Sequence, residues 1–174
     1  MNATIFDLID SGDADGVREL VARDPAAAAA HDEHGLTALM RAAYRGGDVF
    51  VAVRAADPPL GPFDRIMVGE SEGLPAPDAW TPDGFTGLHL AAFAHNAAAA
   101  EKLLDAGADP NAISTASFAQ VTPLGTCAFA NAVEVARVLL ARGADPSIAE
   151  GERNTPRAVA EANGFHDLVD LLSQ

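Results

Sequence analysis

Two stretches of this chain repeat the same order of residues, and this repeat constrains the fold more than any other feature. "GFTGLHLAAFAHNA" starts at Gly84 and "QVTPLGTCAFANAV" starts at Gln120. Each leads into an apolar segment that ends in Gly-Ala-Asp-Pro, at 107–110 and at 143–146. Glycine can adopt the left-handed backbone that ends a helix, and proline cannot continue one. Each copy therefore predicts two short helices joined by a tight loop and followed by a turn.

Weaker copies of the pattern precede and follow these two. Thr37, Thr86, Thr122 and Thr155 fall in register, and small residues follow each of them at the same offset. A threonine is a good helix N-cap, because its hydroxyl accepts an unpaired backbone N–H. Small residues let the two helices of a unit pack closely. Such a unit cannot bury its apolar face alone, so the units are expected to stack.

The middle of the chain departs from the pattern. Leu39 and Leu88 occupy the same place in successive copies, yet they are 49 positions apart, which is too many for one repeat and too few for two. The fragment "PFDRIMVGE" at 62–70 is similar to "IFDLIDSGD" at 5–13, which belongs to an eroded unit at the N-terminus. We therefore predict a compressed unit over 58–80.

Two helices of unequal length are expected in the compressed unit. The first lies near 62–68, and the second is shortened because "SEGLPAPDAW" carries two prolines and a glycine. A disordered insertion is the alternative, but apolar residues such as Phe63, Ile66 and Met67 would then be left in water. Loop 71–81 is expected to be the most irregular feature of the chain.

The residues that carry these copies resemble the ankyrin repeat family. The resemblance is strongest over 83–147, in Thr86, in Leu88-His89-Leu90-Ala91-Ala92 and in Leu103-Leu104 through Gly107-Ala108-Asp109-Pro110-Asn111. The period is close to the roughly 33 residues of that family. The resemblance implies an all-α solenoid of stacked helix-turn-helix units, about five to six with eroded caps, in a single domain over 1–174. The expected units are about 1–31 (cap), 32–57, 58–80 (compressed), 81–113, 114–149 and 150–174 (cap).

Two histidines, His89 and His95, stand six residues apart in the best copy, and their role decides between an enzyme and a scaffold. In the resembled family a histidine at the place of His89 is structural, since it hydrogen-bonds the nearby turn and the threonine of the repeat. Met40 and Gly125 fill that place in other copies, which also disfavours a catalytic role. His95 aligns with Gly46 in the tight loop, where a partly exposed side chain is expected.

Signatures of catalysis or cofactor binding do not stand out in the sequence. We find no Gly-rich phosphate loop, Ser nucleophile elbow, zinc-ligand spacing or dinucleotide fingerprint, and we predict no cofactor. "HDEH" at 31–34 has metal-ligating residue types, but a solvated turn without a third anchor is the favoured interpretation. Cys127 takes the place of an alanine and is expected to be a small buried residue rather than a nucleophile.

Net charge and cysteine content limit the classes of partner. The formal charge is −14 at pH 7 without a basic cluster, so a phosphate backbone would be repelled. The start of the chain lacks the features of a signal peptide, and no apolar run approaches the roughly 20 residues of a membrane helix. A single cysteine allows no intramolecular disulfide, which suits a reducing compartment. We expect a cytoplasmic protein that binds neither nucleic acid nor a membrane.

Stacked units expose a concave surface, which in the resembled family is formed by turn tips and by first-helix residues just after the small pair. Aromatic and sulfur-containing side chains recur at these places, and two arginines one helical turn apart could flank them and bind a carboxylate. The candidate partner-binding residues are Tyr44, Met67, Trp80, Phe85, Phe93, Phe118, Phe129, Arg41 and Arg45. Either these aromatic residues are exposed and bind a partner, or neighbouring tips bury them as core.

The favoured function is a scaffold that binds another protein or peptide on the concave surface. The alternative is a carrier of an apolar small molecule, or an enzyme without a standard motif, whose pocket is formed by the concave face and loop 71–81. Tyr44, Arg41, Asp83 and His95 would supply its polar groups.

Overall fold

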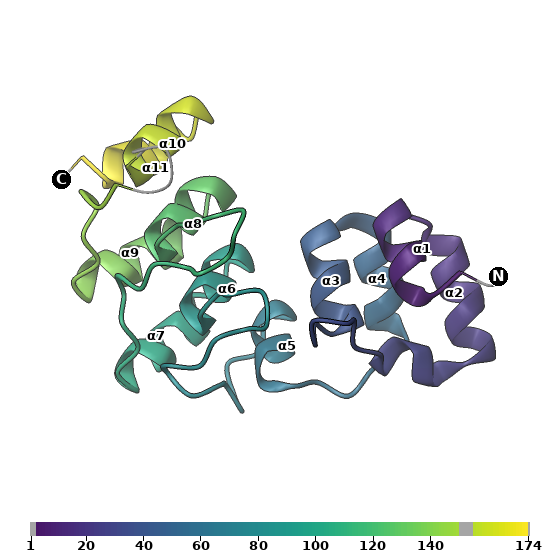
Figure 1. Ribbon diagram of the computed structural model, residues 1–174. Helices are drawn as coiled ribbons and strands as arrows, with labels where there is room; N and C mark the ends of the chain where they lie inside the picture. The colour runs from purple at the N-terminus through teal and green to yellow at the C-terminus, as the bar shows by residue number, and fades with distance from the viewer. Residues whose placement is uncertain (1–2, 150–154, 174) are drawn as a thin grey trace. The chain divides into compact units, whose positions relative to one another are not determined.

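Pairs of short helices recur along the chain in the computed structural model, which describes residues 3–149 and 155–173 (Figure 1). The chain divides into two units, residues 1–64 and 65–174. The division falls inside a short helix, α5, and the predicted single domain over 1–174 stays a prediction. No helix in the described part of the chain is both long and apolar enough to cross a lipid bilayer.

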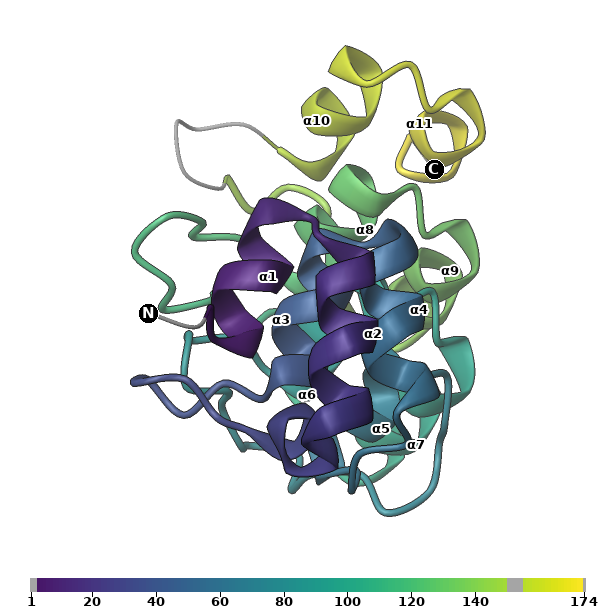
Figure 2. The same cartoon turned by 90° about the vertical axis from the view of Figure 1, so that its right-hand side faces the viewer.

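The first unit is built from two helix pairs. Its elements are α1 (Ile5–Ser11), α2 (Ala14–Arg23), the 3-10 helix η1 (Pro25–Ala29), α3 (Ala38–Arg45) and α4 (Gly47–Ala55). Helix α1 packs against α3 and α2 packs against α4, so the first helices form one layer and the second helices another (Figure 2). Ile9, Val17, Leu39 and Val53 are fully buried in this unit.

The second unit has the same kind of arrangement within itself. Its helices are the end of α5 (Pro62–Met67), α6 (Gly87–Phe93), α7 (Ala97–Asp105), α8 (Pro123–Ala130), α9 (Val133–Ala141), α10 (Pro156–Ala162) and α11 (His166–Leu171). Helix α8 packs against both α6 and α10, while α9 packs against both α7 and α11. Two rows result, one of first helices and one of second helices. Within the described residues there are five helix pairs plus α5, which confirms the predicted all-α fold of about five to six stacked units.

Threonine begins the first helix of most units, as predicted. The hydroxyl oxygens of Thr37, Thr122 and Thr155 accept the backbone N–H groups of Met40, Gly125 and Ala158, at 3.0, 3.1 and 3.3 Å. Each cap satisfies a donor that the helix itself leaves unpaired. The N-terminal unit uses Thr4 in the same way, with Asp7 completing a capping box. Residues 150–154, which begin the last predicted unit, lie outside the described residues.

The tight loops between the helices of a pair need a left-handed residue. Gly46, His95 and Asn131 occupy this place in three units, with φ of 74°, 55° and 58°. Asparagine tolerates this conformation better than most residues and glycine adopts it without cost. His95 is exposed there, as predicted. This loop position therefore requires a particular backbone conformation rather than a particular side chain.

The compressed unit differs from its prediction in one respect. Its first helix, α5, lies where expected, but no second helix forms between Met67 and Gly87. The expected shortened helix is wrong because Pro75 and Pro77, with Gly73 before them, leave no run of residues that can continue a helix. Instead, segment 68–86 is irregular, and its Glu72 forms an ion pair with Lys102 of α7.

Asn96 makes hydrogen bonds to both sides of the segment where the predicted second helix does not form. Its Nδ2 donates to the backbone carbonyls of Ile66 at 3.2 Å and Glu70 at 2.7 Å. Its Oδ1 accepts the N–H of Ala99, which caps α7, and the side chain is buried. One amide thus joins the end of α5 to the start of α7.

We expect Asn96→Ala to lower the free energy of unfolding by about 2–3 kcal/mol, because it leaves buried carbonyl and N–H groups without partners. Urea denaturation followed by circular dichroism measures this change. The matched control is Asn163→Ala, since the exposed Asn163 also donates to a backbone carbonyl, that of Val159. The control should change stability by less than about 0.5 kcal/mol. Equal effects of the two substitutions would contradict the bridging role of Asn96.

Candidate functional site

The buried His89 forms the base of the turn that precedes α6. Its Nδ1 accepts the N–H of Thr86 at 3.2 Å and lies 2.8 Å from the Thr86 hydroxyl. Its Nε2 lies 2.9 Å from the carbonyl oxygen of Val121, and because a carbonyl only accepts, Nε2 carries the hydrogen. Burial lowers the pKa of His89 to about 4, so the ring is neutral at pH 7. These contacts are the structural ones that the family resemblance implied.

The turn tips of neighbouring units meet above this histidine. Thr115 donates its N–H to the carbonyl of Gly84 at 2.9 Å, which ties one tip to the next. The ring of Phe85 packs edge-on against His89 at 5.7 Å between centroids and lies 5.8 Å from the ring of Phe118. Phe118 nevertheless keeps 75% of its side chain exposed. The tips therefore bring two aromatic rings into contact, one of which is largely exposed.

The first helices carry a second pair of exposed rings. Phe93 ends α6 and Phe129 lies near the end of α8, each seven residues after the threonine cap of its helix. Because α6 and α8 pack side by side, the two rings occupy equivalent places on neighbouring helices. Phe93 is 36% exposed and Phe129 is 74% exposed. Contiguous patches of exposed apolar side chains often mark a binding surface.

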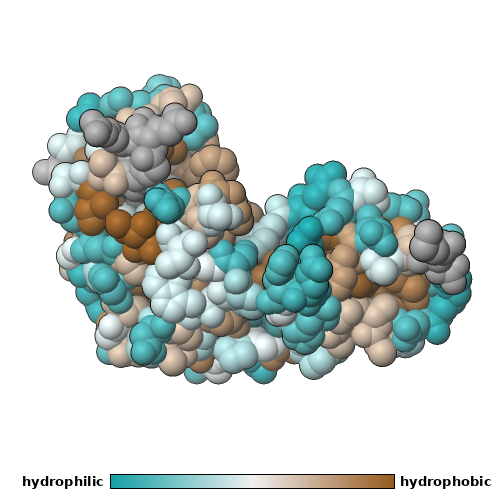
Figure 3. Space-filling model, viewed as in Figure 1, coloured by the Kyte–Doolittle hydropathy of each residue, from teal (hydrophilic) through white to brown (hydrophobic). Residues whose placement is uncertain are grey.

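Trp80 belongs to the hairpin that leads into α6, where it forms an isolated antiparallel bridge with Thr86. Its side chain is 43% exposed. We call Trp80, Phe85, Phe93, Phe118 and Phe129 the aromatic surface. Figure 3 shows brown, apolar areas among teal, hydrophilic ones on this unit. The sequence left open whether these aromatic residues are exposed or buried as core. Four of the five rings are exposed, and Phe85 is half-buried.

Met67, which the sequence analysis grouped with these aromatic residues, is buried. It ends α5 and is only 7% exposed, so it belongs to the core rather than to the exposed residues. Ile113 was not among the candidate residues, although it is 50% exposed. It lies in the turn before α8, and an apolar residue in a turn segment is the only signal that the sequence offers for it.

Three candidate residues, Tyr44, Arg41 and Arg45, belong to the first unit and lie on α3. The guanidinium of Arg41 donates to both carboxylate oxygens of Asp10, at 2.9 and 2.8 Å, and lies 3.4 Å from Asp32. Arg41 is therefore engaged by carboxylates of its own chain rather than left available for a partner. Tyr44 is half-buried and Arg45 is exposed.

The "HDEH" segment forms a turn that one carboxylate organises. The Oδ1 of Asp32 accepts the N–H groups of His34 and Leu36, both at 2.9 Å. Among the described residues, no group of three potential metal ligands is found. Cys127 is fully buried in α8, as expected of a residue that replaces a packing alanine.

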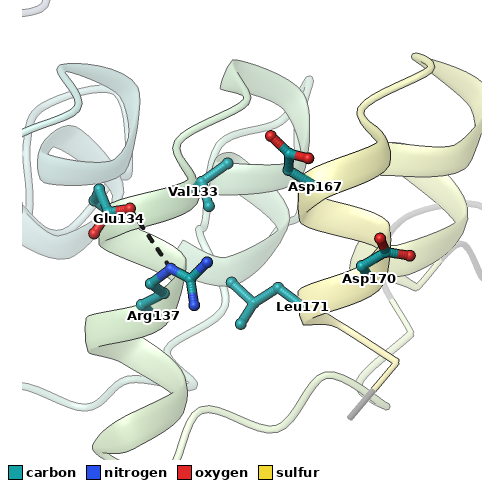
Figure 4. A pocket seen from close by; sticks show the side chains of 6 residues that line it. All are labelled: Val133, Glu134, Arg137, Asp167, Asp170 and Leu171. Atoms are coloured by element: carbon teal, nitrogen blue, oxygen red, sulfur yellow. Dashed lines mark ion pairs between the residues drawn. The ribbon is translucent and has the colours of Figure 1, made fainter.

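A shallow pocket of about 380 Å³ lies between α9 and α11 (Figure 4). Glu134 and Arg137 form an ion pair at 3.5 Å across one turn of α9. Both helices belong to the row of second helices, so this pocket is not the predicted one beside loop 71–81. Its lining residues are Val133, Glu134, Arg137, Asp167, Asp170 and Leu171.

Comparison with known proteins agrees with this geometry. Residues 83–115, which span α6, α7 and the tip of the next unit, match the family model of the ankyrin repeat. No curated protein matches the chain.

Proposed function

Since this chain is an ankyrin repeat protein, we propose that it binds another protein or a peptide on the aromatic surface. Ankyrin repeats are in general protein–protein interaction modules. The observation that carries the proposal is the equivalent placement of Phe93 and Phe129 on neighbouring first helices, where Phe93 is 36% and Phe129 is 74% exposed. Aromatic side chains are preferred anchors of interfaces, because they bury a large area with few rotatable bonds.

The stacked repeat also supports a rigid binding surface. Two neighbouring tips are hydrogen-bonded through Gly84 and Thr115, and the ring of Phe85 contacts both the buried His89 and the ring of Phe118. A surface that is already ordered loses little conformational entropy on binding. The alternative, a small-molecule pocket closed by loop 71–81, stays a prediction.

Phe129→Asp tests the proposal. Peptides selected on the immobilised protein from a displayed random library serve as probes, and their affinity is then measured by fluorescence anisotropy. We expect Phe129→Asp to weaken the selected peptides by about thirtyfold or more, the range of an interface hot spot. A charge inserted into an apolar contact has to be desolvated without a partner.

The matched control is Val51→Asp, because Val51 is also a large exposed apolar residue, 59% exposed on α4. This variant should bind the peptides as the wild type does. Circular dichroism should show unchanged helix content in both variants. Peptides that bind the Phe129 variant as tightly as the wild type would overturn the proposed site.

A further inference from the structure

The segments that carry the aromatic surface have an unusual charge pattern. Segments 78–94 and 111–131 contain two acidic residues, Asp78 and Asp83, and no lysine or arginine. The one imidazole within them, that of His89, is buried and neutral at pH 7. The fixed charge carried by these two segments is therefore negative.

The two acidic residues are near two of the rings in the sequence. Asp78 is exposed two residues before Trp80, and Asp83 stands two residues before Phe85 on the same hairpin. The Oδ1 of Asp83 accepts the hydroxyl of Thr81 at 2.6 Å, which fixes the side chain at the tip. A hydroxyl stabilises the carboxylate but leaves its charge uncompensated.

In the described part of the unit, no ion pair joins these carboxylates to a lysine or an arginine. Every described lysine or arginine in residues 65–173 forms an ion pair with another acidic residue. The pairs are Arg65–Glu70, Lys102–Glu72, Arg137–Glu134, Arg142–Asp105 and Arg157–Glu161. With a net charge of −14 on the whole chain, no excess of basic groups exists elsewhere to neutralise the tips.

We propose that the ligand of the aromatic surface is an apolar peptide segment that carries lysine or arginine, with its cation placed against Asp78 and Asp83. The proposal rests on the proposed function and specifies the chemistry of the partner. Apolar side chains of the segment cover Phe93 and Phe129, while the cation pairs with the acidic hairpin. Complementary charge speeds association and fixes the register of the bound segment, and like charge rejects acidic competitors.

The peptides selected from the random library test this specificity. We expect an excess of lysine and arginine beside their apolar residues. Replacement of these basic residues by glutamine should weaken binding, and added NaCl should do the same because it screens exposed charges. In the protein, Asp78→Asn and Asp83→Asn should each weaken the basic peptides about threefold to fivefold. Asparagine keeps the acceptor for Thr81, so folding should be retained.

Glu101→Gln is the matched control, since it removes one negative charge from an exposed residue of α7 in the row of second helices. It should change the affinity by less than about twofold. Selected peptides that need Phe129 but show no basic preference would overturn this inference and leave the proposed function standing. A library that yields no Phe129-dependent peptide would overturn both.

Discussion

Substitution of Gly84 by alanine is expected to lower the free energy of unfolding by about 3 kcal/mol, through two separate costs. Gly84 has a φ of +91°, which side-chain-bearing residues rarely adopt. A Cβ at this position would also lie 2.6 Å from the Thr115 hydroxyl oxygen and 2.7 Å from the backbone nitrogen of Ala116. The neighbouring tip would have to move, so the hydrogen bond from Thr115 to Gly84 would be lost as well.

Gly107→Ala separates these two costs. Gly107 has a similar φ of +99°, but a Cβ there would have no atom within 4 Å. This control should lose about 1–2 kcal/mol from backbone strain alone. Urea denaturation of both variants, followed by circular dichroism, gives the difference. If both variants lose the same stability, the close contact between neighbouring tips does not contribute.

The repeat made most of the fold predictable. Glycine, threonine, proline and small residues mark helix ends and close contacts, and their recurrence at one offset predicted the helix pairs, the caps and the structural role of His89. The repeat length follows from the backbone conformation of each unit, so it is kept even where individual side chains differ between units. His95 and Asn131 illustrate this, because they take the left-handed place that Gly46 fills in another unit.

The side chains of the candidate site were harder to predict, because their exposure depends on contacts between units. Met67 was expected beside the exposed aromatic residues, but it is buried at the end of α5. Arg41 was expected to flank the site, but it binds Asp10, which is 31 positions away in the chain. Asn96 compensates for a missing helix that the sequence had only shown as shortened. Each of these outcomes depends on long-range pairs that no local pattern encodes.

Acidification from pH 7 to pH 5 is expected to cost about 2 kcal/mol of stability through His89 alone. Burial lowers the pKa of this ring to about 4 from the ordinary value of 6.5. The unfolded chain therefore binds a proton at His89 as the pH falls below 6.5, while the folded chain stays unprotonated until about pH 4. The free energy of unfolding falls throughout this window, and above pH 6.5 the histidine adds no pH dependence.

His89→Gln isolates this contribution, because glutamine can donate to Val121 and accept from Thr86 but does not titrate. The variant should be less stable than the wild type at pH 7, yet its stability should fall less, by about 2 kcal/mol, between pH 7 and pH 5. Comparison of the two proteins over the same pH range cancels the carboxylates, including Asp7 and Asp145, whose hydrogen bonds lower their pKa. Identical pH profiles for the two proteins, or an NMR titration that places the pKa of His89 near 6.5 in the folded chain, would contradict the prediction.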